Sequence, residues 1–206
     1  SYNNLKVDTY LAETEKRTYR YRRYGAFCLD TVKMKLTELN INTFEQSKFV
    51  NSLYGGIIRQ FPKATDASIK NPFLKQLILA DFECLPLTKE FKKIHKWFVG
   101  FHKIRITTNS RSLAHATPEG IHCDGHQFVV QHFISRQNII GGVSQIYDRK
   151  KNSLDKITFD EFLDTCFVDD KRVMHSVSPL KSTDNMNGYR DMLIIDFEPR
   201  CKQEGK

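Results

Sequence analysis

A histidine and an aspartate stand two positions apart within residues 118–125, as His122 and Asp124. If this segment is extended, successive side chains alternate between two faces, so both project to one side and Cys123 projects to the other. An imidazole and a carboxylate on the same face can bind one metal ion, and they are two of the three ligands in the facial triad of non-haem iron(II) oxygenases. By itself the pair is a weak signal, because such pairs also arise by chance.

A third ligand must come from elsewhere in the chain, and His175 is the candidate. It lies in an alternating run, residues 172–177, that is typical of a short strand late in the sequence. Three protein ligands on one octahedral face leave positions open for an α-keto acid and dioxygen. We therefore predict an iron(II) site formed by His122, Asp124 and His175.

Other residues near this motif are weaker metal candidates. His126 and His132 share the strand parity of His122 and stay open as alternative ligands, although such histidines more often support a site or lie on the surface. A thiolate ligand at Cys123 is disfavoured, since its side chain would face the opposite side of the strand. The remaining histidines have no partner pattern and are expected to be structural: His95, His102 and His115.

Arg190 begins the last apolar run, residues 190–197. Arginine is permanently charged and can grip both oxygens of a carboxylate, which lysine does less well. Alone, an arginine at a strand entrance is more often a surface residue. Given the proposed metal ligands, we predict instead that Arg190 binds the distal carboxylate of a co-substrate.

The composition fits a globular protein. The 206 residues are 40% hydrophobic and 27% charged, which is ordinary for one domain with a full core. No run approaches the roughly 18–20 apolar residues that cross a bilayer, and the N-terminal residues show no signal-peptide pattern. The five cysteines are odd in number and form no CxxC pair, which favours a reducing compartment. We expect a cytoplasmic protein.

The net charge of +8 raises the question of an anionic partner. The densest basic run, residues 16–23, interleaves tyrosines that could stack on bases. The same run fits a helix or its exit with the tyrosines packed inward. Charge alone indicates association behaviour rather than fold, so we do not expect a nucleic-acid partner.

Residues 1–99 are expected to be mainly a helical scaffold. Asp30 could cap a helix through Leu39, and Thr88 could begin another. Thr43 and Gln46 have the spacing of a capping box, ahead of a helix that would end before Pro62. Apolar residues recur at helical intervals in two of these expected helices. They are Phe49, Val50, Leu53 and Ile57 in the helix after Thr43, and Phe91, Ile94 and Phe98 in the helix after Thr88.

After residue 100 the pattern changes to short β-rich runs separated by turn residues. These runs span residues 101–107, 127–135, 143–148, 165–168, 172–177 and 190–197. Several short strands at this spacing favour a sandwich or barrel. We predict one α+β domain over residues 1–206, with helices packed outside a β core that spans residues 100–198.

Three stretches carry a family resemblance. PEGIHCDGHQFVVQHFISRQNIIGGVSQIYD, DDKRVMHSVSPL and YRDMLIIDF together resemble the bacterial 2-oxoglutarate/Fe(II) dioxygenases that hydroxylate free amino acids, the family of L-isoleucine 4-hydroxylase. The resemblance implies a double-stranded β-helix (jelly-roll) core, with His122, Asp124 and His175 as iron ligands. It also implies Arg190 as the partner of 2-oxoglutarate. Cys123 replaces the basic or polar residue usual between the ligands, and Met192 replaces a serine found in some other oxygenases.

The resemblance also implies a reaction. Fe(II), 2-oxoglutarate and O2 would hydroxylate an unactivated C–H bond of a small substrate, a free aliphatic L-amino acid, with release of succinate and CO2. Such a substrate needs a cation for its carboxylate and an acid for its amine. Arg105 and Glu119, just before the metal motif, are the candidates for substrate binding.

Rival interpretations remain open. The same iron and 2-oxoglutarate chemistry could act on a protein or nucleic acid, in which case the positive charge would serve the larger substrate. A cupin-type isomerase would need more histidine ligands and no Arg190. A non-catalytic jelly-roll binding module is the alternative from another class, and the intact ligand set argues against it.

Overall fold

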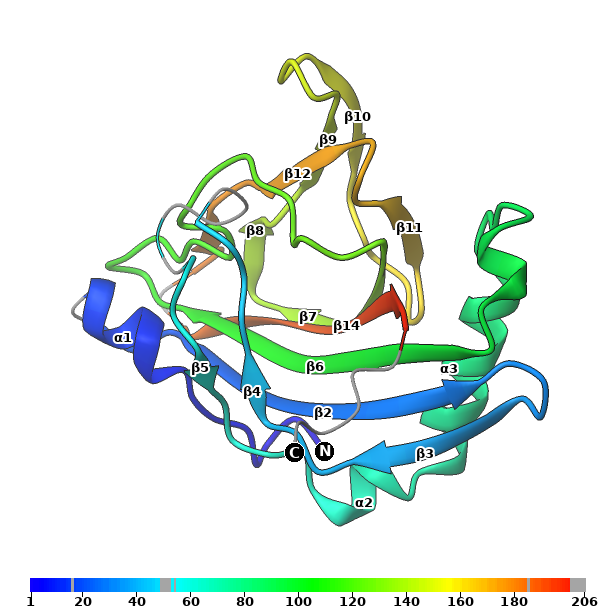
Figure 1. The fold of residues 1–206 in the computed structure, drawn as a ribbon. Coiled ribbons are helices and arrows are strands. Elements are labelled where there is room, and N and C mark those ends of the chain that lie inside the picture. The colour runs from blue at the N-terminus through cyan, green and yellow to red at the C-terminus, as the bar shows by residue number, and fades with distance from the viewer. Residues whose placement is uncertain (16, 49–52, 54, 185, 201–206) are drawn as a thin grey trace.

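Long antiparallel strands form the main sheet of the protein (Figure 1). The computed structural model describes residues 1–15, 17–48, 53, 55–184 and 186–200. Within them the strand order is β1-β2-β6-β14-β7-β11, and β3 pairs with β2. The strands of this seven-stranded sheet are β1 (Lys6–Val7), β2 (Arg20–Asp30), β3 (Lys35–Leu39), β6 (Lys96–Thr108), β7 (Phe128–Gln137), β11 (Thr165–Asp169) and β14 (Gly188–Pro199).

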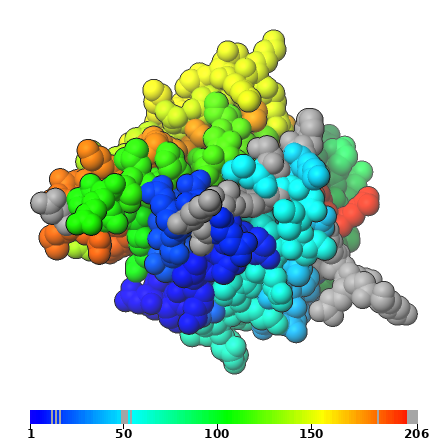
Figure 2. All heavy atoms as spheres, turned by 90° about the vertical axis from the view of Figure 1, so that its left-hand side faces the viewer, coloured from blue at the N-terminus to red at the C-terminus, as the bar shows by residue number. Residues whose placement is uncertain are grey.

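Smaller sheets face one side of the main sheet (Figure 1). Of these, one has three strands in the order β10-β9-β12, and two are pairs, β13-β8 and β4-β5. Their bounds are β4 (Thr43–Phe44), β5 (Arg59–Gln60), β8 (Ile139–Gly141), β9 (Ser144–Tyr147), β10 (Ser153–Ile157), β12 (Met174–Val177) and β13 (Leu180–Ser182). In Figure 2 the N-terminal residues (blue), the segment with β4 and β5 (cyan) and the segment after β6 (green) share one face of the molecule.

Helix α3 (Pro72–Cys84) covers the other side of the main sheet (Figure 1). It begins at Asn71, whose side chain accepts hydrogen bonds from the backbone N–H groups of Phe73 and Leu74, and proline follows at the first helical position. Its buried residues pack with sheet residues in the largest apolar cluster, which includes Leu74, Ile78, Phe82, Phe27, Trp97, Phe101, Val130, Ile195 and Phe197. The other helices are short: α1 (Thr9–Glu15), α2 (Asp66–Ile69) and one 3-10 turn (Phe91–Lys93).

Strand alternation sorts the two faces of the main sheet. In β6, Trp97, Val99 and Phe101 are buried in the cluster that contains α3, whereas His102 and Ile104 project to the opposite face and line a cavity there. Because side chains alternate along a strand, one strand supplies both the apolar core and the wall of the cavity.

The β-rich runs predicted after residue 100 are confirmed. Each of the six overlaps an observed strand: β6, β7, β9, β11, β12 and β14. The prediction missed the shorter β8, β10 and β13, whose three to five residues give little alternation to detect.

The prediction of a mainly helical scaffold in residues 1–99 is wrong for most of the described residues. This part of the chain contains α1, α2 and α3, but it also contains β1 to β5 and the start of β6. β2 lies next to β6 in the main sheet, so the two parts of the chain share one sheet. Asp30 does not cap a helix. Its carboxylate accepts hydrogen bonds from the N–H groups of Val32 and Lys33 in the turn between β2 and β3, and the same side chain chemistry serves turns and helix caps equally well.

The other two predicted helices also differ from the structure. Thr43 lies in strand β4, and the side chain of Gln46 donates to the carbonyl of Asp124 instead of closing a capping box; Phe49 and Val50 lie outside the described residues. Thr88 accepts a hydrogen bond from Phe91 N–H, yet only the 3-10 turn follows, and Phe98 belongs to β6. Tertiary pairing overrides these local patterns.

The basic run contributes to β2 rather than to a helix. Lys16 lies outside the described residues, and residues 20–23 are the first four of β2.

Among the residues that the structure describes, no helix is long and apolar enough to cross a membrane. Four cysteines in the described part are free thiols, namely Cys28, Cys84, Cys123 and Cys166, and Cys201 lies outside it. A cytoplasmic location stays a prediction.

We expect Ile78→Ala to lower the free energy of unfolding by about 3 kcal/mol, because it opens a cavity between α3 and the main sheet. Ile78 is fully buried. Phe73→Ala is the matched control on the same helix, since Phe73 is 54% exposed, and it should change stability by about 0.5 kcal/mol or less. Chemical denaturation measures both, and equal losses would contradict this account of the core.

Candidate functional site

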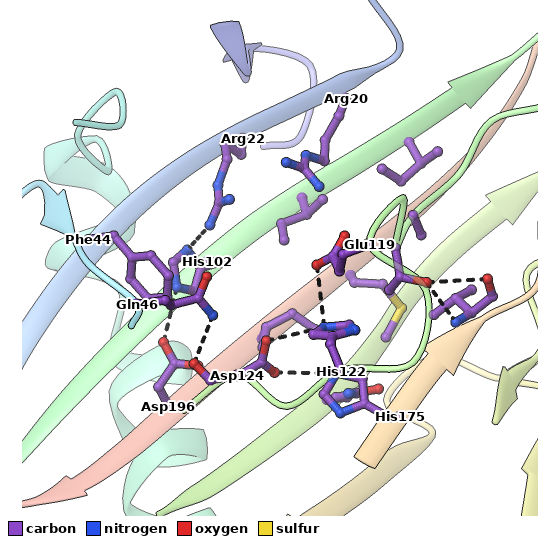
Figure 3. A pocket seen from close by; sticks show the side chains of 18 of the residues that line it. Arg20, Arg22, Phe44, Gln46, His102, Glu119, His122, Asp124, His175 and Asp196 are labelled. Atoms are coloured by element: carbon purple, nitrogen blue, oxygen red, sulfur yellow. Dashed lines mark hydrogen bonds and ion pairs between the residues drawn. The ribbon is translucent and has the colours of Figure 1, made fainter. Parts of the chain in front are cut away.

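His122 and His175 are brought together by main-chain pairing. His122 N–H donates to the His175 carbonyl at 3.0 Å, and His175 N–H donates to the His122 carbonyl at 2.8 Å. This isolated bridge ties the segment after β6 to strand β12. The two imidazole rings therefore lie side by side, with centroids 4.4 Å apart (Figure 3).

Asp124 completes a group of three possible metal ligands (Figure 3). Its Oδ1 lies 3.6 Å from His122 Nε2, and its Oδ2 lies 3.4 Å from His175 Nε2. One ligand atom from each of the three residues lies within 4.8 Å of the others. Apart from the bridge at His122, the segment is a loop rather than the strand that we assumed, yet the two side chains still point to one place.

The hydrogen bonding of His122 suits a metal ligand. Its Nδ1 lies 3.0 Å from the carbonyl oxygen of Gly120, and a carbonyl can only accept, so the proton is assigned to Nδ1. The lone pair of Nε2 is then directed toward Asp124 and His175. A backbone carbonyl that fixes the tautomer in this way is the usual support for a metal-binding histidine. Two imidazoles and one carboxylate are also the donor set of the iron facial triad.

The pKa values of His122, His175 and Asp124 show how the three side chains affect one another's charge. Burial disfavours charge on His122, but the carboxylates of Asp124 and Glu119 outweigh it and raise the pKa of His122 to about 9. Burial lowers the pKa of His175 to about 4. Despite its burial, the two imidazoles hold the pKa of Asp124 well below its usual range. The carboxylate thus favours positive charge between the rings, which a divalent ion would supply.

The neighbouring candidates point elsewhere. Cys123 contacts Arg149 and the carbonyl of Val173 on the far side of the loop, so its side chain faces away from the three ligands. His132 bonds to Asp81 and Thr165. His126 lies between the carboxylates of Asp196 and Glu198. Within the described residues, neither histidine joins the metal-binding group.

Asp170 holds the loop that carries Asp124. Its buried carboxylate accepts hydrogen bonds from three successive backbone N–H groups, those of Asp124 at 2.9 Å, Gly125 at 2.6 Å and His126 at 3.2 Å. Gln46 donates to the Asp124 carbonyl at 2.7 Å from the other side. These contacts fix the backbone of the loop, and therefore the direction of the Asp124 side chain.

A cavity adjoins the three ligands and continues along the inner face of the main sheet. Its walls combine charged and apolar groups: Arg20, Arg22, Arg59, Arg190, Glu119, Asp196, His102, Gln46, Gln131, Thr117, Phe44, Ile104, Ile106, Ala116, Val177, Met192 and Ile194, besides the three ligands. Buried charges of this kind are costly unless they are paired or bind a ligand.

Arg190 is a buried cation in the wall of this cavity. Its side chain is only weakly bonded, with Nη2 3.4 Å from Ser144 Oγ, and it packs 5.7 Å from the centre of the Phe159 ring. Burial and the nearby Arg136 lower the pKa of Arg190 to about 10. In the described part of the chain, no carboxylate lies within ion-pair distance of it. This arginine is therefore available to bind an anion.

The two residues proposed to bind substrate have different surroundings. Arg105 projects to the outer face of the main sheet, where its Nε and Nη2 each lie 2.7 Å from an oxygen of Asp191; the structure does not bring it to the cavity. Glu119 does line the cavity. Its Oε1 lies 3.6 Å from His122 Nε2, and its buried Oε2 has no hydrogen-bond partner among the described residues.

Sequence reasoning missed a buried polar network in the cavity wall (Figure 3). Arg22 donates to Nδ1 of His102, and Nε2 of His102 lies 3.0 Å from Asp196 Oδ2. Burial and Arg22 lower the pKa of His102 to about 4. His102, expected to be structural, thus lies in the wall of the site. Basic residues at every second position of the run, Arg20 and Arg22, were the available signal, because that spacing puts them on one face of a strand.

Known proteins resemble this chain over nearly its whole length. A family model described as 2OG-Fe dioxygenase matches residues 1–196. L-isoleucine-4-hydroxylase of Bacillus thuringiensis is 29% identical over 198 residues, which cover 95% of this chain and 79% of that protein. The 3(1)-hydroxy-L-isoleucine 4-dioxygenase of Pantoea ananatis (strain AJ13355) is 26% identical over 200 residues, 96% of this chain and 78% of the relative.

Solved structures share the fold. The crystal structure of a bsmA homolog from Methylobium petroleophilum PM1 has a TM-score of 0.85 and 27% sequence identity, and the match covers 100% of this chain and 81% of the other. The structure of IDO from Bacillus thuringiensis has a TM-score of 0.77 at 22% identity, over 97% of this chain and 79% of the other. At that identity the second likeness concerns the fold alone.

We expect Asp170→Asn to weaken metal binding by about 10- to 100-fold, because an amide presents a donor where three N–H groups need an acceptor. Titration of the purified protein with Mn(II), followed by calorimetry, measures the affinity. Asp169→Asn is the matched control, since within the described part of the chain the Asp169 side chain accepts a hydrogen bond only from Lys171 N–H. Unchanged Mn(II) affinity in a folded Asp170→Asn variant would contradict the role given to Asp170.

Proposed function

The chain belongs to the 2OG-Fe dioxygenase family, and on that basis we propose that it hydroxylates an unactivated C–H bond of a free aliphatic L-amino acid. It is an oxidoreductase that uses Fe(II), 2-oxoglutarate and O2. The observation that carries the proposal is the convergence of His122, Asp124 and His175 beside the buried Arg190 in one cavity. The substrate class is taken from the two relatives named for isoleucine and hydroxy-isoleucine.

His122, Asp124 and His175 are the proposed iron ligands. Their two neutral nitrogens and one carboxylate match the metal, and the Gly120 carbonyl and Asp170 hold two of them in place. The oxidation is chemistry that iron, dioxygen and 2-oxoglutarate supply when bound, with succinate, CO2 and a hydroxylated product as the outcome. The protein contributes position and shelter from water.

Arg190 is the proposed partner of 2-oxoglutarate. A planar guanidinium can bind both oxygens of the distal carboxylate, and its burial strengthens that interaction, since little water competes for it. Val177 and Met192 line the same cavity. Their apolar side chains suit the two methylene groups of the co-substrate and exclude water between the carboxylate and the ligands.

The arrangement of strands supports a double-stranded β-helix (jelly-roll) core. The β10-β9-β12 sheet faces the main sheet (Figure 1). His175 lies on β12, and His122, on the segment after β6, pairs with it. Enzymes of this type hold the metal between two facing sheets, where strands distant in sequence can each supply a ligand. The helical part is a minor layer outside this core.

The walls of the cavity favour a small zwitterion with an apolar side chain. Ile104, Ile106 and Ile194 provide apolar surface, which fits an aliphatic side chain. Glu119 lies beside the proposed ligands and could accept an ammonium group, whereas Arg105 is occupied by Asp191. Cations other than Arg105 must therefore hold the carboxylate of the substrate.

We expect succinate release to be stimulated by a free L-amino acid in the presence of Fe(II), ascorbate and 2-oxoglutarate. The assay screens the twenty amino acids, beginning with L-isoleucine, and mass spectrometry should find a product heavier by one oxygen atom. His175→Ala should abolish this activity, because two remaining ligands hold iron poorly. If no amino acid stimulates turnover, the proposed substrate class is wrong while the iron site stands.

We expect Arg190→Met to raise the KM for 2-oxoglutarate by about 100-fold, because it removes a buried charge-assisted pair. Arg190→Lys should recover only part of the loss, since an ammonium group cannot bind both oxygens. The KM for the amino acid serves as the internal control and should change little. An unchanged KM for 2-oxoglutarate would show that the co-substrate binds elsewhere.

A further inference from the structure

A second buried arginine lies on the same row of the main sheet as Arg190. Arg20 in β2 and Arg190 in β14 both pair with Ile106 of β6. Their main chains are therefore two strand spacings apart, about 10 Å. Both side chains project to the inner face and line the cavity. The sheet thus presents two cationic positions, with the apolar side chain of Ile106 between them.

Arg20 keeps a net positive charge available to the cavity. Its Nε donates to Asp8 Oδ2 at 2.8 Å, but the same oxygen lies 3.6 Å from Arg22 Nη1. One carboxylate thus serves two guanidinium groups, so Asp8 does not neutralise Arg20 alone. Among the described residues no acceptor bonds to the Nη atoms of Arg20, so this end of the side chain can hold a ligand.

The two remaining arginines of this wall, Arg22 and Arg59, contact neighbouring side chains. Arg22 donates to His102 and packs over the ring of Phe61, with its guanidinium carbon 3.7 Å from the ring centre. Arg59 donates to the side-chain oxygen of Gln46 and lies over the ring of Phe44. These contacts hold both side chains in the wall. Arg20 is therefore the better candidate for direct contact with a small anion.

Glu119 supplies the opposite charge in the wall of the cavity. Its side chain is 10% exposed, and Oε2 is buried without a hydrogen-bond partner among the residues described. A buried carboxylate oxygen without a donor is costly, and an ammonium group would supply three donors. In Figure 3 the Glu119 side chain lies beside His122, and Arg20 lies farther from His122 than Glu119 does.

We propose that Arg20 and Glu119 form a clamp for the α-carboxylate and α-ammonium groups of the substrate. This inference rests on the proposed function and specifies which residues recognise the amino acid. Arg190 then holds the carboxylate of 2-oxoglutarate, and Arg20 holds that of the substrate. Ile104 and Ile106, on β6 between β2 and β14, separate the two anions. With both charged ends fixed, the aliphatic side chain is the part left free to lie against the metal ligands.

The test compares three ligands that differ in their charged groups. They are the amino acid selected by the succinate screen (L-isoleucine in the first instance), its carboxamide, and its deaminated acid. Calorimetry measures their binding to the protein loaded with Mn(II) and 2-oxoglutarate, without turnover. The variants are Arg20→Met and Glu119→Gln. Arg23→Met is the matched control, because Arg23 is on the same strand but donates to the backbone carbonyls of Asn4 and Lys63.

Wild-type protein should bind the amino acid about 100-fold more tightly than either analogue. Arg20→Met should abolish the preference for carboxylate over carboxamide and keep the preference for the amine. Glu119→Gln should do the reverse, and Arg23→Met should keep both. Affinity for 2-oxoglutarate should stay within about threefold of wild type in all three variants, as expected for separate sites.

Two negative results can be told apart. If wild-type protein turns over no amino acid, the proposed function fails, and the clamp fails with it. If wild-type protein turns over an amino acid but Arg20→Met weakens all three ligands equally, or none of them, the clamp alone is overturned. The clamp is likewise overturned if Glu119→Gln keeps the full preference for the amino acid over its deaminated acid.

Discussion

The pair of backbone hydrogen bonds between His122 and His175 is the constraint on which the site depends. It joins a loop after β6 to the short strand β12, and it brings two imidazoles to the same carboxylate. Hydrogen bonds from the main chain set this geometry, so it does not rest on the side chains alone. Asp170 extends the constraint to the third proposed ligand, because its carboxylate accepts hydrogen bonds from three N–H groups of the loop that carries Asp124.

The main sheet gives each of its faces a different task. Its outer face packs against α3 through large apolar side chains such as Trp97 and Phe101, and this burial is the main source of stability. Its inner face carries arginines, a histidine and aliphatic groups around the cavity. A sheet that is packed against the apolar core on one face is rigid. It can therefore hold charged residues on its other face at fixed spacing, which a flexible loop could not do.

The buried charges of the inner face differ in how far the protein satisfies them. Arg22, His102 and Asp196 are linked by hydrogen bonds, which hold these side chains in the wall. Among the residues that the structure describes, Arg190 has no carboxylate at ion-pair distance, and Glu119 has no cationic neighbour other than the imidazole of His122. Burying charges without full compensation lowers stability, and proteins retain such groups chiefly where a ligand completes them. The incomplete pairs therefore mark the places where small anions and cations bind.

The sequence by itself predicted the three candidate ligands and the arginine at the last strand, because these follow from residue chemistry. It also predicted the β-rich runs after residue 100, because a strand has a period of two. The common side of His122 and Asp124 arises in a loop rather than in the strand that we assumed. The sequence misassigned residues 30–39 and the helix start expected at Thr43, since Asp30 and Thr43 have the chemistry of helix caps and of turns or strands alike. Only the tertiary structure decided that Arg105 faces Asp191 while Arg20 and Glu119 face the cavity. That outcome is set by the pairing of β2, β6 and β14, whose register arises from contacts between residues far apart in the chain.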